Sequence, residues 1–159
     1  MSAFPIARAA AKPRTDTAVK ISLLYAAILV VFAVAQLFTF DEFIKLVPQF
    51  QLPIGEGLTA AIAPMIVASE VFALPFLLRM KLSSGFRYFS MGLGWLVTGL
   101  WLGITSWVVI TAQPVSTIGF LGTIGHLSPG WWAILVAVGL GILTAWSSWG
   151  LWPGARAKK

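Results

Sequence analysis

Residues 58–78, LTAAIAPMIVASEVFALPFLL, form an apolar run that contains one ionisable side chain, Glu70. The hydrocarbon core of a bilayer is about 30 Å thick and is crossed by about 20 helical residues, so this run predicts a transmembrane helix. A charged carboxylate at that depth costs about 2.5–3.5 kcal/mol on insertion scales. We therefore expect Glu70 to face the interior of a helical bundle, either as a structural, hydrogen-bonded group or as a group that handles protons or binds a ligand.

The composition of the 159-residue chain is typical of an integral membrane protein. Hydrophobic residues make up 58% of it and charged residues only 10%, whereas about a quarter of the residues of a soluble domain are charged. The net charge of +6 comes from basic clusters outside the apolar runs, which indicates topology signals rather than nucleic-acid binding. Because cysteine is absent, the chain by itself forms no disulfide and no thiolate metal site.

Further apolar runs along the chain predict an all-α fold, an integral membrane four-helix bundle. A basic N-terminal segment, residues 1–20, precedes the spans, and a basic tail, residues 153–159, follows them. In the linker 41–57, apolar residues interleave with charged ones, which predicts a short helix lying in the membrane interface. The four expected spans are residues 21–40, 58–78, 88–112 and 131–152.

The distribution of Lys and Arg predicts the orientation of these spans. Ten of the 11 basic residues lie before the first span, between the second and third, or in the tail, and Lys45 alone lies in the opposite loops. Short loops with such a bias follow the positive-inside rule. We expect both termini to be cytoplasmic, the loops 41–57 and 113–130 to face the outside or periplasm, and the membrane to be a bacterial inner membrane.

Small residues indicate where the helices pack. Helices in a bilayer associate through close approach at Gly and Ala and through occasional polar contacts. Candidate packing residues are Gly99 and Gly103 in the third span and Ala133, Ala137, Gly141 and Ala145 in the fourth.

Three polar or aromatic side chains join Glu70 as candidates for a proton or ligand site. Gln36 is the one strongly polar side chain of the first span. Trp95 and Trp101 lie within the third span, where either packing or the lining of a pocket for a quinone or pigment ring explains a tryptophan. Most of the other tryptophans mark the two headgroup levels.

The segment 113–130 carries no charged residue and contains the only histidine, His126. We expect this segment to dip back into the membrane, to lie on its surface, or to be covered by a partner. His126 is a solvated histidine, an axial ligand to haem or a chlorophyll-type magnesium, or a proton relay. Since one histidine completes neither a bis-histidine haem site nor a zinc site, a metal role requires another chain or open coordination.

The motif FTFDEF at 38–43, a proline-bearing linker, and the pairs Ala63-Pro64 and Ser69-Glu70 resemble the DoxX/MauE-like group of four-helix membrane proteins. The resemblance covers roughly residues 21–112. It implies a compact bundle associated with membrane redox systems, such as quinone-linked oxidation or the maturation of periplasmic redox enzymes. The cysteine-free chain departs from members that take part in thiol chemistry.

No P-loop, dinucleotide fingerprint, nucleophile elbow or set of paired metal ligands occurs in the sequence. We therefore expect a non-catalytic accessory or assembly subunit of a larger membrane redox complex, with the bilayer and other membrane subunits as partners. One alternative is a quinone-binding oxidoreductase module with Glu70 as the proton-handling group. A second is a small transporter. A quinone, haem or pigment held together with partner chains remains open as cofactor.

Overall fold

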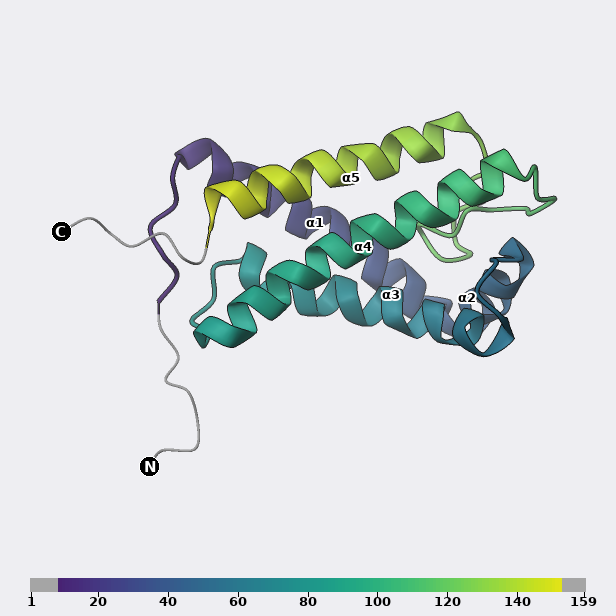
Figure 1. The fold of residues 1–159 in the computed structure, drawn as a ribbon, viewed down its shortest axis with the longest axis horizontal. Coiled ribbons are helices and arrows are strands. Elements are labelled where there is room, and N and C mark those ends of the chain that lie inside the picture. The colour runs from purple at the N-terminus through teal and green to yellow at the C-terminus, as the bar shows by residue number, and fades with distance from the viewer. Residues whose placement is uncertain (1–8, 153–159) are drawn as a thin grey trace, which may run out of the picture.

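Four long apolar helices pack side by side as a bundle in the computed structural model, which describes residues 9–152 (Figure 1). All four are long and apolar enough to cross a membrane, which confirms the predicted all-α membrane bundle. The predicted tail 153–159 and the first eight residues of the basic N-terminal segment lie outside the described residues. The long helices are α1 (Asp16–Phe38), α3 (Glu56–Leu77), α4 (Ser84–Ile110) and α5 (Trp131–Gly150).

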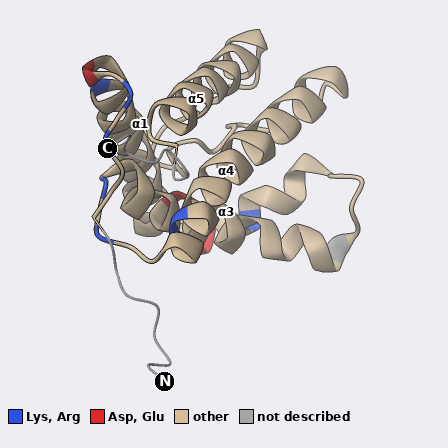
Figure 2. Cartoon of the chain, turned by 60° about the vertical axis from the view of Figure 1, so that its left-hand side comes forward, with Lys and Arg blue, Asp and Glu red and all other residues tan. Residues whose placement is uncertain are grey.

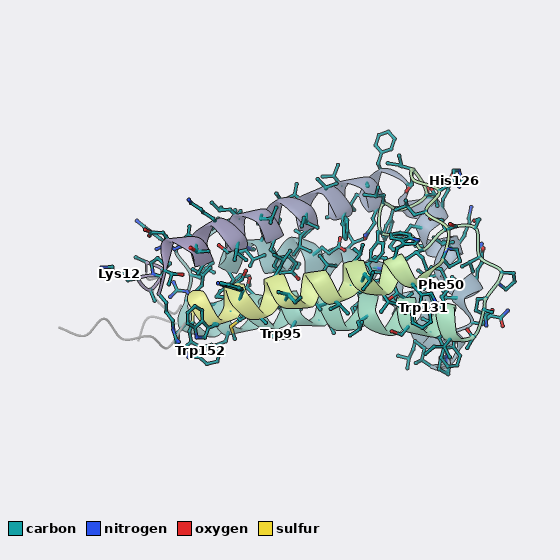
Figure 3. The ribbon with its side chains drawn as sticks, turned by 90° about the horizontal axis from the view of Figure 1, so that it is seen from above. Lys12, Phe50, Trp95, His126, Trp131 and Trp152 are labelled. Carbon is teal, nitrogen blue, oxygen red and sulfur yellow. The ribbon has the colours of Figure 1, made fainter. Side chains whose placement is uncertain are left out.

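The helices alternate in direction and form a closed ring, in which α1 and α4 each pack against both α3 and α5. Consequently, the described chain starts and finishes at the same end of the bundle. Lys12 and Trp152 lie at this end, and Phe50, His126 and Trp131 lie at the other (Figure 3). Most of the Lys and Arg residues gather at the first of these ends, which Figure 2 brings forward. We call it the basic end and the opposite one the loop end.

Two helices begin earlier than their apolar runs, because polar side chains cap them. The Thr15 hydroxyl accepts a hydrogen bond from the Ala18 amide at the start of α1 (3.1 Å). The Ser83 hydroxyl accepts one from the Phe86 amide at the start of α4 (3.3 Å). Such caps satisfy amides that have no partner in the first helical turn. The helices therefore extend past the apolar spans into polar sequence.

The linker between the first two spans forms the short helix α2 (Phe40–Leu46) and a 3₁₀ turn, η1 (Val47–Phe50). A short helix was expected here. Its apolar side chains, however, face the protein, since Phe43, Leu46, Val47 and Phe50 are all buried in the common core. The linker thus closes the loop end of the bundle.

A hydroxyl on α4 supports the proline-containing part of α3. Pro64 and Pro75 both lie inside α3, and proline removes a backbone donor from a helix. The Ser90 hydroxyl donates to the Phe72 carbonyl (2.6 Å) and accepts from the Phe76 amide (3.1 Å). Phe72 and Phe76 are one helical turn apart on either side of Pro75, so Ser90 fastens α3 to α4 where the helical ladder is interrupted.

We expect Ser90→Ala to lower the free energy of unfolding by about 1–3 kcal/mol, the usual cost of leaving a buried polar group without its partner. Ser106 is a matched control, because it lies on the same helix without being fully buried. Chemical unfolding in bicelles measures both variants. Equal stabilities of Ser90→Ala and Ser106→Ala would rule out this role for the hydroxyl.

The candidate packing residues divide into two groups. Ala133 and Ala137 are fully buried on α5, and a Cβ placed on Gly141 would lie 3.4 Å from Thr98 Cγ2 of α4. Ala145, Gly99 and Gly103 are exposed, and a Cβ on either glycine would meet nothing within 4 Å. The first group packs within this chain, whereas a side chain added at either glycine of the GxxxG pair would reach no other part of the described residues.

Candidate functional site

The structure brings three of the five candidate site residues together in the bundle interior. Gln36 comes from the last turns of α1, Glu70 from α3 and Trp101 from α4, and all three side chains are fully buried. We call these three residues the Glu70 cluster. Intramembrane polar groups avoid lipid by turning inward, which explains why polar residues of separate spans converge.

One carboxylate oxygen of Glu70 holds the cluster together. Glu70 Oε1 accepts hydrogen bonds from Trp101 Nε1 (3.2 Å) and from Gln36 Nε2 (3.3 Å). Gln36 Nε2 also donates to the backbone carbonyl of Phe120 (3.1 Å). The acid therefore links three helices, and through Gln36 it is connected to the 113–130 segment as well.

Two acceptor atoms of the same cluster are left over. Glu70 Oε2 and Gln36 Oε1 are buried, and neither has a hydrogen-bond partner among residues 9–152. The orientation of the Gln36 amide follows from its contacts, because its nitrogen donates to two acceptors and an oxygen in that place would face both. Buried acceptors without a donor are costly in an apolar interior. The cluster can thus accept a proton or a hydrogen bond from a further group.

The Phe120 ring packs against the Trp101 ring of the cluster. Its ring centroid lies 4.6 Å from that of Trp101, 5.4 Å from that of Phe32 and 6.1 Å from that of Trp132. Its side chain is only 2% exposed. The middle of the 113–130 segment is therefore buried in the loop end of the bundle, which explains why this long connection carries no charge.

The segment is fastened to α1 and α2 by polar contacts around Thr123. The Thr123 amide donates to the Thr39 hydroxyl (3.1 Å), and the Thr123 hydroxyl donates to Glu42 Oε2. Gly122 has a φ of +57° and lies so close to α1 that an added Cβ would collide with the Thr39 hydroxyl. A glycine is required here both for the backbone conformation and for the close approach.

The other two candidate residues lie away from the cluster. The Trp95 ring is 46% exposed, and its Nε1 donates to the Ser148 hydroxyl of α5 (3.1 Å). His126 is exposed at the loop end (Figure 3). Among residues 9–152, no group of three or more His, Asp or Glu side chains is arranged to hold a metal ion. A role for His126 as an axial ligand stays a prediction.

The contribution of Phe120 was missed at the sequence level. The signal for it was the missing charge in 113–130 together with the repeated TIG motif, in which Thr117-Ile118-Gly119-Phe120 precedes Thr123-Ile124-Gly125-His126. Those features indicate a buried or covered segment but not which residue enters the bundle.

Comparisons of the chain with known protein families, with curated proteins and with solved structures gave no match. The four-helix layout implied by the resemblance to the DoxX/MauE-like group is present in the structure, but no family comparison supports membership of that group.

Proposed function

We propose that this chain is a non-catalytic accessory or assembly subunit of a larger membrane complex. The observation that carries the proposal is the exposed GxxxG pair of α4. Gly99 and Gly103 adjoin a shallow apolar groove and leave room for the backbone of another helix, as close helix pairs in membranes require. Besides the two glycines, the groove is lined by Leu52, Pro53, Ile54, Ile62, Leu100, Ile104 and Trp107.

The Glu70 cluster supports the same proposal. Its hydrogen bonds join α1, α3 and α4, so the helices α3 and α4 that line the groove are held together before any partner binds. Preorganised surfaces lose less conformational entropy on association. The proposed occupant of the groove is a transmembrane helix of a larger subunit. We take that complex to be a redox complex, as the sequence resemblance implied.

The absence of cysteine allows a direct test by single-cysteine cross-linking in native membranes. Gly103→Cys places a thiol in the groove, whereas Val138→Cys places one at a similar distance from the loop end on an exposed face of α5. We expect Gly103→Cys, with its thiol coupled to a benzophenone maleimide and then illuminated, to form an adduct with one larger membrane protein, identified by mass spectrometry, and the identically treated Val138→Cys to form none. If the variant yields only a dimer of the chain, or no adduct beyond that of Val138→Cys, the accessory role is contradicted.

We further propose that the basic end faces the cytoplasm and the loop end faces the periplasm of a bacterial inner membrane. The gathering of Lys and Arg at one end of the bundle supports this orientation (Figure 2). A membrane-impermeant maleimide applied to intact cells should label Gln49→Cys at the loop end and leave Lys12→Cys unlabelled. The reverse pattern would invert the proposed topology.

A second candidate function is a quinone-binding oxidoreductase module with Glu70 as its proton-handling group. The direct contact between Glu70 and the Trp101 indole favours it, since an acid beside a flat ring is a suitable place for a reacting quinone. Under this proposal Glu70→Gln abolishes quinone-dependent turnover while the fold survives. Unchanged turnover in that variant would remove this candidate.

A further inference from the structure

Residues 117–127 form a small unit with its own hydrogen bonds. The Ile118 amide donates to the Leu127 carbonyl (2.9 Å), so the two ends of the unit are joined. The Thr117 hydroxyl donates to the Gly125 carbonyl (3.0 Å) and accepts from the Leu127 amide (3.2 Å). Compact surface loops whose ends lie close together and that pack on their own side chains are frequently functional. None of these internal bonds has to break when the unit leaves the bundle.

Few polar contacts hold this unit on the helices. They are the bond from Gln36 to the Phe120 carbonyl and the two bonds of Thr123 to Thr39 and Glu42. The unit also packs on the helices through the Phe120 ring and its aromatic neighbours, through the fully buried Ile118, and at Gly119, where an added Cβ would lie 3.0 Å from Leu46 Cδ2. The Phe120 ring therefore occupies a space among aromatic side chains that suits a flat ring. The backbone carbonyl oxygen of Phe120 lies beside the Gln36 amide.

The oxygen atoms of the Glu70 cluster that have no partner within residues 9–152 can take up a hydrogen-bond donor. Glu70 accepts a hydrogen bond from the Trp101 indole, and Gln36 donates one to the Phe120 carbonyl. The second oxygen of Glu70, Oε2, and the side-chain oxygen of Gln36, Oε1, have no hydrogen-bond partner among the described residues. An aromatic ring with a hydroxyl group supplies the missing donor and the flat surface together. Gln36 Oε1 can only accept a hydrogen bond, so a ring that carries only acceptors would leave this oxygen unsatisfied.

A shallow, lipid-facing hollow lies beside the unit. Ile124 forms one wall, and the other wall is an apolar stripe of α1. A ligand dissolved in the bilayer can reach the edge of the unit here without crossing water. The α1 residues of the hollow are Val30, Val31, Val34, Ala35 and Phe38.

We propose that residues 117–127 are a movable lid over a binding site formed by Gln36, Glu70 and Trp101, and that the ligand is a flat, membrane-soluble aromatic ring carrying a hydroxyl group. The ligand ring takes the place of Phe120, and its hydroxyl donates to the free oxygen of Glu70 or Gln36. The proposal concerns binding alone and holds whether or not the chain is an accessory subunit.

The test compares two probes of the same ring system with the full chain in nanodiscs. 1-Naphthol carries a hydroxyl donor, whereas 1-methoxynaphthalene carries only an acceptor. Binding is followed by the NMR shift of the Trp101 indole N–H, and lid opening by hydrogen exchange of the Thr123 amide, which is bonded to Thr39 in the closed lid. We expect 1-naphthol to bind about tenfold more tightly, the value of one hydrogen bond to a charged or strongly polar acceptor, and to accelerate Thr123 exchange.

Phe120→Ala provides the second arm, because it removes the competing ring and leaves the cluster intact. This variant should bind 1-naphthol more tightly than the native chain and keep the preference over 1-methoxynaphthalene, whereas Gln36→Leu should reduce that preference. Equal binding of the two probes to native chain and Phe120→Ala, or binding without faster Thr123 exchange, would overturn the proposal. If Gln36→Leu fails to fold, the relative affinity of Phe120→Ala for 1-naphthol and 1-methoxynaphthalene still tests the proposed binding site.

Discussion

Replacing Glu70 with alanine is expected to lower the free energy of unfolding by about 2–5 kcal/mol. The Trp101 indole N–H would lose its acceptor and the Gln36 amide one of two, and a buried donor without a partner costs about 1–3 kcal/mol. The cavity left by the side chain adds to the loss. Chemical unfolding of the chain in bicelles, followed by the near-ultraviolet signal of the tryptophans, measures the change.

Glu70→Gln is the matched control for this prediction. The glutamine side chain keeps an oxygen that accepts from both donors and nearly the same volume, so we expect a loss of less than about 1 kcal/mol. If both variants were as stable as the native chain, the hydrogen bonds to Glu70 would not be what holds α1, α3 and α4 together. Equal and large losses would instead show that the acidic group itself is required.

Adding a single methyl group at Gly122 is expected to lift the lid off the bundle. Gly122→Ala forces a left-handed backbone conformation on a residue with a side chain, which costs about 1–2 kcal/mol. Its Cβ would also collide with the Thr39 hydroxyl and lie 3.0 Å from the Ala35 carbonyl oxygen, and such overpacking costs about 1–3 kcal/mol. We therefore expect the closed lid to be destabilised by about 2–5 kcal/mol.

Hydrogen exchange distinguishes lid opening from general unfolding in this variant. The Thr123 amide should exchange much faster, because its bond to Thr39 breaks, while amides in the middle of α4 keep their protection. Gly125→Ala is the control in the same loop, since the nearest atom to its Cβ is the flexible end of Leu121 at 3.3 Å. Unchanged Thr123 exchange in Gly122→Ala would mean that the lid does not rest against α1 as described.

The spans and the bundle were predictable because hydropathy and helix length act along the sequence alone. Residues 58–78 have the length and polarity of a membrane helix whatever their neighbours are. The inward direction of Glu70 followed in the same way from the cost of a carboxylate in lipid. The early starts of α1 and α4 were not predicted, since the caps at Thr15 and Ser83 lie outside the apolar pattern.

The site was only partly predictable, because its assembly depends on how the elements pack. Gln36 and Trp101 were candidates, but nothing in the sequence joins them to Glu70 or brings Phe120 over them. Trp95 and Trp101 are six residues apart on α4, which turns their side chains about 120° away from each other. One ring therefore enters the bundle, and the other faces its surface and Ser148.

The glycine pattern shows a similar limit. Gly99 and Gly103 have the spacing of a packing motif, as Ala133 and Ala137 do, yet among residues 9–152 the alanines are fully buried and an added Cβ at either glycine would meet nothing within 4 Å. Spacing reveals that two residues share a helix face. It does not reveal whether that face meets a helix of the same chain, a partner or lipid.

The most direct measurement of the central claim, that the 113–130 segment is seated in the bundle on the Glu70 cluster, is the nuclear Overhauser effect between the rings of Trp101 and Phe120. Their centroids lie 4.6 Å apart, so strong cross-peaks between the two rings are expected for the chain in nanodiscs, with the Trp101 signals assigned through Trp101→Phe. The absence of these cross-peaks, together with rapid exchange of the Thr123 amide in the native chain, would contradict the claim.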